Sequence, residues 1–151
     1  MDKKNYITMN SLENHHWWFV SRRKIINKIL NSFINKNKKN NILEIGCGTG
    51  GNLLMLSEYG KLHAIEIDNY SRKIAKSKNI CDIKYCELPD KIPYDLYFDT
   101  ICLFDVLEHI EDDKSSIKTI YDQIKIDGNI VLTVPAFNFL WSGHDVINHH
   151  F

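Results

Sequence analysis

Short apolar runs alternate with amphipathic segments along most of this chain. The apolar runs have the length of strands, and the segments between them place apolar residues at helical spacing. Alternation of this kind predicts an α/β fold, with a parallel sheet that carries helices on both faces. The expected strands are residues 41–45, 61–67, 83–86, 98–104 and 129–134, and the expected helices are 52–60, 69–79 and 113–128.

Turn and cap residues set the expected boundaries of these elements. Gly60 and Gly128 are predicted to end helices, and Asp68 to cap the helix that follows it. The connection after the third strand contains Pro89 and Pro93. It has about a dozen residues, so a loop or a single turn is expected there.

An amphipathic helix is predicted before the first strand, and residues 36–41 (KNKKNN) form a linker-like run after it. Asn10 or Ser11 would cap an earlier helical turn, with Glu13 three residues after Asn10. The apolar face of the amphipathic helix consists of Ile25, Ile26, Ile29, Leu30, Phe33 and Ile34.

Composition narrows the class of protein. The 151 residues are 44% hydrophobic and 25% charged, with a formal net charge of +0. No global field would attract nucleic acid or an acidic membrane. The chain starts without a signal peptide, and no apolar run approaches the roughly 18 residues of a membrane span, so a cytoplasmic protein is predicted.

The cysteines form no Cys-x-x-Cys pair, so reduced thiols are predicted. They are Cys47, Cys81, Cys86 and Cys102.

A glycine-rich loop follows the first strand. Gly46, Gly48 and Gly51 match the spacing G-x-G-x-x-G, which lets a ligand approach the backbone closely. Glu66 follows about 20 residues later, where a carboxylate would hold ribose hydroxyls. These features suit a nicotinamide dinucleotide and S-adenosylmethionine equally.

Acidic residues separate the two cofactor classes. Glu44 stands two residues before the first glycine, and Asp105 and Glu108 follow the fourth strand. Carboxylates at these positions would repel a pyrophosphate and would suit a cationic ligand. S-adenosylmethionine carries a sulfonium and an ammonium and has no phosphate, so it is favoured.

The sequence resembles the class I S-adenosylmethionine-dependent methyltransferases over residues 42–136. The resemblance rests on LEIGCGTGGN, AIEID, ELPDKIPYDLYFDTICLFDVLEHI and IKIDGNIVLTVPA. Two flanking stretches, ENHHWWFVSRRKII and PAFNFLWSGHDVINHH, are similar to a small-molecule subgroup associated with glycan and lipid biosynthesis.

The resemblance implies a Rossmann-like three-layer sandwich with about five mostly parallel strands in the order 3-2-1-4-5. Residues 1–41 would form a helical lid, 42–136 the S-adenosylmethionine-binding domain, and 137–151 the start of a substrate-binding region. The family's sheet usually has two more strands, so the chain resembles a C-terminally truncated member. The fifth strand would then be an exposed edge, which predicts a homodimer.

The resemblance also assigns the site residues. Glu44, Gly46, Cys47, Gly48 and Asn52 would surround the methionine part of the cofactor. Glu66 would hold the ribose, and Ile67, Glu87 and Leu88 would contact the adenine. The backbone of Phe104 would accept a hydrogen bond from the ammonium group.

His109, at the mouth of the fourth strand, is the predicted catalytic base for a hydroxyl acceptor; an amine acceptor would not need one. Asp105, Glu108 and His109 also resemble a metal cluster of some quinone-biosynthesis methyltransferases, but no metal is predicted. His144, His149 and His150 are interpreted as a solvated tail.

Two interpretations of Trp17, Trp18, Arg22 and Arg23 remain open. In the first interpretation, the tryptophans pack on the sheet and the arginines are solvated. In the second, the segment forms a flap over the site, and one of its arginines pairs with a carboxylate or a phosphate.

The predicted function is therefore methyl transfer from S-adenosylmethionine to a small-molecule acceptor, such as a sugar or a lipid-linked intermediate. The alternatives are a cofactor-binding fragment or subunit that is inactive alone and, less favoured, a nicotinamide-dependent oxidoreductase. A nucleic-acid methyltransferase is disfavoured by the neutral charge.

Overall fold

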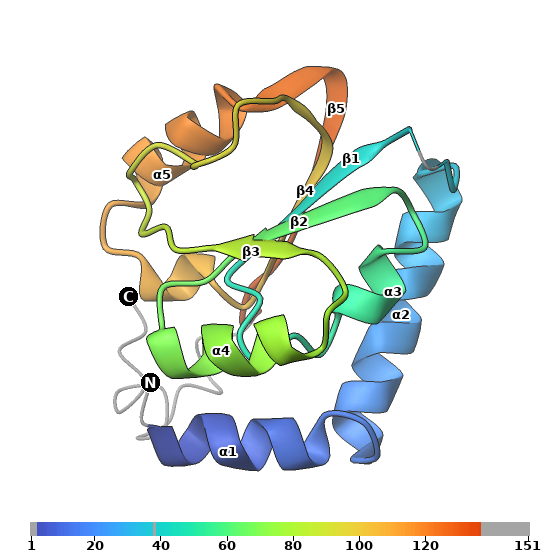
Figure 1. Cartoon of the computed structure of the whole chain (residues 1–151). Helices are drawn as coiled ribbons and strands as arrows, with labels where there is room; N and C mark the ends of the chain where they lie inside the picture. The colour runs from blue at the N-terminus through green and yellow to red at the C-terminus, as the bar shows by residue number, and fades with distance from the viewer. Residues whose placement is uncertain (1–2, 38, 137–151) are drawn as a thin grey trace.

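The computed structural model describes residues 3–37 and 39–136, and the predicted tail at 137–151, including its three histidines, lies outside them. Within the described residues, five strands form one sheet in the order β3-β2-β1-β4-β5, and every neighbouring pair is parallel (Figure 1). The predicted sheet and strand order are confirmed. The strands are β1 (Asn41–Ile45), β2 (Lys61–Ile65), β3 (Asp82–Lys84), β4 (Phe98–Phe104) and β5 (Ile124–Thr133).

Helices and one long loop cover the two faces of the sheet. One apolar cluster joins the sheet to α2, α3 and α4, and a second joins it to α5 and to the helix-free segment 85–97. That segment is the predicted loop. The helices are α1 (Lys3–Leu12), α2 (Trp17–Phe33), α3 (Leu53–Leu56), α4 (Asn69–Ser77), the short 3₁₀ helix η1 (Leu107–His109) and α5 (Asp113–Tyr121).

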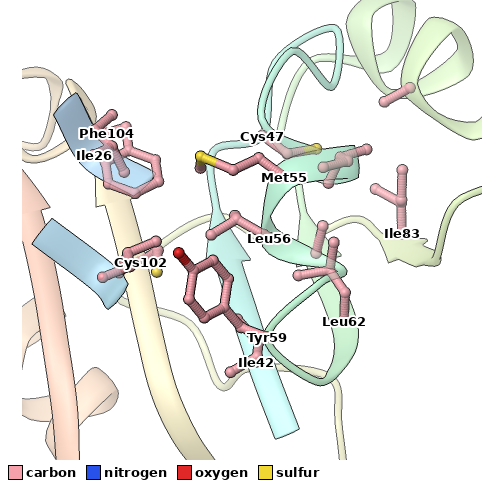
Figure 2. Packing of buried hydrophobic residues seen from close by; sticks show 14 of the residues in the cluster. Ile26, Ile42, Cys47, Met55, Leu56, Tyr59, Leu62, Ile83, Cys102 and Phe104 are labelled. Carbon is pink, nitrogen blue, oxygen red and sulfur yellow. The ribbon is translucent and has the colours of Figure 1, made fainter. Parts of the chain in front are cut away.

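The first cluster anchors the N-terminal helix α2 to the sheet. Ile26 and Leu30 of α2 are buried in the same cluster as Cys102 and Phe104 of β4 (Figure 2). Tyr59 lies at the centre of this packing, and its hydroxyl donates a hydrogen bond of 2.6 Å to Oδ1 of Asn27. Each fully buried aliphatic side chain here contributes about 2 kcal/mol to the free energy of folding. The segment before β1 is therefore part of the folded core.

Three predicted boundaries are wrong. The helix expected over 113–128 ends at Tyr121, and β5 begins at Ile124. The alternating residues from Ile124 onward pair with β4 through an irregularity in register, and this pairing outweighs helical propensity. Gly60 does not end a helix, because α3 ends at Leu56; a Cβ at Gly60 would collide with the backbone of Asn40.

At the N-terminus, α1 runs through Asn10 and Ser11, so neither residue caps a helix. The predicted cap of α4 is confirmed, because the Asp68 side chain accepts a hydrogen bond of 2.7 Å from the backbone N–H of Ser71. A side-chain carboxylate at this position satisfies one of the free N–H groups of the first turn.

The edge strand β5 pairs with β4 on one side. Ile130 and Leu132 on this strand are 37% and 40% exposed, and Ile126 is 96% exposed. Apolar side chains on α2 are exposed as well: Ile25 at 60% and Ile29 at 49%.

Among the described helices, none has both the length and the hydropathy that a membrane crossing requires.

Candidate cofactor-binding site

The glycine loop leaves β1 in a conformation that depends on three glycines. Gly46, Gly48 and Gly50 have φ angles of +69°, +54° and +89°. The left-handed region favours glycine because a Cβ would clash with the following carbonyl. Gly51, which the sequence motif included, does not have a positive φ, and Gly50 takes the third left-handed position instead.

This loop is fixed to the neighbouring strand β2 by backbone hydrogen bonds. The N–H groups of Gly46 and Cys47 both donate to the carbonyl of Ile65, at 2.9 and 3.2 Å. A Cβ built on Gly48 would meet no atom within 4 Å. The loop is therefore rigidly placed, with an open side at Gly48 where a ligand can approach the backbone.

Glu66 lies directly after β2, beside the glycine loop. It is 4% exposed, and its two carboxylate oxygens accept hydrogen bonds from the N–H groups of Gly48 at 2.7 Å and Asp68 at 2.8 Å. Burial raises the pKa of this carboxyl group, and the two N–H donors act against that rise. Each oxygen keeps a second lone pair, so the group can also accept from ribose hydroxyls.

Glu44 lies within β1 and is 1% exposed. Its Oε1 accepts a hydrogen bond of 3.1 Å from Nδ2 of Asn52, while its Oε2 is buried without a hydrogen-bond partner. Burial raises the pKa of Glu44 to about 7. A buried carboxylate with an unpaired oxygen is unfavourable unless a cation or a hydrogen-bond donor binds to that oxygen.

The remaining predicted binding residues lie around the same edge of the sheet. Phe104 ends β4 and is 8% exposed within the core, while Ile67 follows Glu66 and is 48% exposed. Glu87 and Leu88 come after β3, the strand beside β2. Glu87 is exposed, Leu88 packs against the second apolar cluster, and Cys47 is a buried thiol.

The acidic turn after β4 makes a different contact from the one expected. Asp105, at a φ of +56°, pairs with the guanidinium of Arg22 at 2.6 Å and accepts a hydrogen bond of 2.8 Å from Thr133. His109 lies on η1 and is partly exposed. The described side chains include no group of three or more histidine, cysteine, aspartate or glutamate residues that could hold a metal ion.

The N-terminal segment contacts this site, partly through residues that the sequence did not single out. Trp17 and Trp18 are 70% and 42% exposed, so the interpretation that they pack on the sheet is wrong. Arg22 instead pairs with a carboxylate of the same chain. Glu13, considered only as part of a helix cap, is buried and accepts a hydrogen bond of 2.7 Å from the Thr49 hydroxyl in the glycine loop.

A comparison with protein families matches residues 15–146 to the family described as "Methyltransferase domain". The chain belongs to this family. The predicted methyltransferase class is therefore confirmed for this domain.

Two relatives extend the comparison to individual proteins. The methyltransferase domain is 27% identical over 135 residues to an "Uncharacterized methyltransferase" of Staphylococcus carnosus, covering 87% of this chain and 62% of that protein. It is 30% identical over 144 residues to "Ribosomal RNA small subunit methyltransferase A" of Wigglesworthia glossinidia brevipalpis, covering 88% of this chain and 46% of that protein. The chain thus spans about half to two thirds of the length of these relatives.

Solved structures share the fold at low sequence identity. DesVI of Streptomyces venezuelae superposes with a TM-score of 0.72 at 11% identity, over 94% of this chain and 61% of DesVI. The sugar N-methyltransferase KedS8 of a Streptoalloteichus species superposes with a TM-score of 0.66 at 14% identity, over 80% of this chain and 50% of KedS8. At these identities the likeness concerns the Rossmann-like methyltransferase fold.

Proposed function

We propose that this methyltransferase domain binds S-adenosylmethionine at the carboxyl edge of its sheet and transfers the methyl group to a small-molecule acceptor of the sugar or lipid-linked class. Family membership supports the reaction type. The observation that carries the choice of cofactor is Glu44, a carboxylate that is 1% exposed and has one oxygen without a partner.

The residues present fit this cofactor. The free Oε2 of Glu44 would pair with the ammonium of its methionine part, and the remaining lone pairs of Glu66 would accept from the ribose hydroxyls. Gly48 lets the cofactor approach the backbone, because a Cβ there would meet no atom within 4 Å. When bound, S-adenosylmethionine supplies an electrophilic methyl group on a sulfonium centre. The chain's own contribution is to position it and to exclude water.

The same residues disfavour a nicotinamide dinucleotide. A pyrophosphate beside this loop would face the carboxylate of Glu44, which is buried. Like charges in a poorly solvated site repel strongly, because little water screens them. An oxidoreductase is therefore the weaker alternative.

His109 is proposed as the base that takes the proton from a hydroxyl acceptor. Imidazole titrates near neutral pH, and η1 holds the residue at the carboxyl edge of β4. An amine acceptor would react without such a base. Replacement of His109 by Asn is expected to leave cofactor binding unchanged and to abolish transfer to hydroxyl acceptors alone.

The acceptor class rests on two supports of different kinds. One solved structure with this fold is a sugar N-methyltransferase, and the ENHHWWFVSRRKII stretch is similar to the glycan and lipid subgroup. The relative named for ribosomal RNA favours a nucleic-acid acceptor instead. A formal net charge of +0 opposes that alternative, because nucleic-acid affinity depends on basic contacts with phosphates.

Calorimetric titration of the purified chain with S-adenosylmethionine tests the proposal, with NADH as the control ligand. We expect S-adenosylmethionine to bind in the micromolar range, NADH not to bind, and Glu66→Ala to abolish the signal. NADH binding would refute the choice of cofactor. Binding without transfer to nucleotide-activated sugars, lipid-linked sugars or RNA would favour the alternative of a fragment or subunit that works with another chain.

A further inference from the structure

Glu13 lies in the turn between α1 and α2, yet it is 3% exposed. Its Oε2 accepts a hydrogen bond of 2.7 Å from the hydroxyl of Thr49, which is itself 2% exposed. Its Oε1 forms an ion pair with Nζ of Lys78, the residue that caps the end of α4. One carboxylate therefore joins the N-terminal segment, the glycine loop and α4.

The glycine loop is shaped to receive this carboxylate. A Cβ on Gly51 would lie 3.1 Å from Oε2 of Glu13, so the absence of a side chain at Gly51 makes room for it. The backbone carbonyl of Glu13 accepts a further hydrogen bond from the Arg23 guanidinium. A carboxylate that is buried with both oxygens satisfied constrains its partners, because breaking either contact leaves an unpaired polar group.

The same segment reaches the predicted ribose carboxylate. α1 packs against α4 (Figure 1). Tyr6 on α1 lies beside Ser71 and near Glu66. Burial and the nearby negative charges of Glu66 and Asp68 raise the pKa of Tyr6 to about 12. Two residues of the N-terminal segment, Tyr6 and Glu13, thus lie against the residues that frame the glycine loop.

We propose that Glu13 is a positioning residue for the cofactor site, which holds the glycine loop in its binding conformation and ties that conformation to the docking of α1. This inference rests on the proposed function. Glu13 acts through Thr49 and does not itself contact the cofactor. Loss of the contact frees both α1 and residues 46–52, and the cofactor must then order them at the expense of its affinity.

The test compares Thr49→Val, which removes the hydroxyl while keeping the shape, with Thr49→Ser, which keeps the hydroxyl. Glu13→Gln serves as a second variant that keeps an acceptor for Thr49 but loses the charge that pairs with Lys78. We expect Thr49→Val to raise the dissociation constant for S-adenosylmethionine about tenfold and Thr49→Ser to remain within about twofold of the wild type. Glu13→Gln is expected to fall between them.

A second readout does not require the cofactor. Amide hydrogen exchange of residues 3–12 and 46–52 in the ligand-free protein is expected to accelerate in Thr49→Val and not in Thr49→Ser. Lys36→Ala, which breaks the surface ion pair with Glu58 away from the site, is the matched control and is expected to change neither readout.

The outcomes separate this inference from the proposed function. Wild-type affinity in Thr49→Val overturns the positioning role, as does unchanged exchange over residues 46–52. If the wild type itself does not bind S-adenosylmethionine, the proposed function fails. The exchange experiment then still decides whether Glu13 fixes the loop, and the coupling to the cofactor is refuted.

Discussion

Arg22 in the N-terminal helix α2 and Asp105 after β4 form an ion pair of 2.6 Å, although 83 positions separate them in the chain. Thr133 at the end of β5 completes a triad, since its hydroxyl accepts from Arg22 at 2.7 Å and donates to Asp105 at 2.8 Å. The helix before the sheet is thereby fixed to the carboxyl ends of two strands. These contacts hold α2 beside the candidate cofactor-binding site.

Replacement of Arg22 by Ala is expected to lower the free energy of unfolding by about 1 kcal/mol, because the pair is partly exposed and its charges are screened. Urea denaturation measures this change. The matched control is Lys118→Ala, which removes an exposed pair with Asp122, the residue that caps the end of α5, and should cost about 0.3 kcal/mol. Equal effects of the two substitutions would contradict a special role for the triad.

The stability of the ligand-free protein is expected to fall as the pH rises toward neutrality. The pKa of Glu44 rises from 4.5 to about 7 on folding, so the folded protein holds a proton that the unfolded chain releases. The proton on Glu44 therefore contributes to the free energy of unfolding. The contribution is fully present below the pKa of the unfolded chain and is lost as the pH rises through the pKa of the folded protein. The total loss is at most about 3 kcal/mol. Urea denaturation between about pH 5 and about pH 8 measures the slope.

The control for this pH dependence is Glu44→Gln, which carries no titrating group at the same position. It should remove the contribution of Glu44 to the slope and be more stable than the wild type at about pH 8. The same slope in both proteins would show that other groups cause it.

Cofactor affinity is expected to change with pH in the opposite direction. Only the ionised form of Glu44 pairs with the cofactor's ammonium, so the affinity should fall about tenfold per pH unit below the folded pKa. Titration calorimetry at several pH values measures this dependence. Glu44→Gln should bind weakly at every pH, and if it kept the affinity of the wild type, Glu44 would not contact the ammonium.

The β5 edge is expected to join two copies of this chain. Ile130 and Leu132 are exposed on a strand of 10 residues, and among the described residues β4 is the one strand that pairs with it. A strand edge without a partner is a template for further pairing. Sedimentation velocity should detect a dimer whose fraction rises with concentration, and the double substitution of both residues by Lys should abolish it. Leu54→Lys on α3 is the control, because this side chain is 69% exposed away from that strand. A wild-type monomer at all concentrations would refute the dimer.

The alternation of apolar and amphipathic segments predicts the parallel sheet, and the residue type at Asp68 predicts the helix cap, because these features depend on local chemistry. The strand order followed only from the resemblance to a known family, because no local pattern determines which strands are neighbours. The predicted end of the helix at residue 128 is wrong, because Ile124 and Ile126 suit a helix and a strand equally. Only the pairing with β4 makes this segment a strand. The contact of Glu13 with Thr49 spans 36 positions, and no local pattern marks it. Contacts of this range depend on the folded arrangement of the N-terminal segment.

The thiol of Cys47 lies inside the glycine loop and is 6% exposed. Burial raises its pKa above the usual range, so the reactive thiolate is scarce while the loop is closed. An alkylating reagent will therefore modify this cysteine only when the loop opens, and the rate at which its peptide gains mass measures how often that happens. The protein contains its own reporter of site opening, at a position where an introduced label would disturb the site.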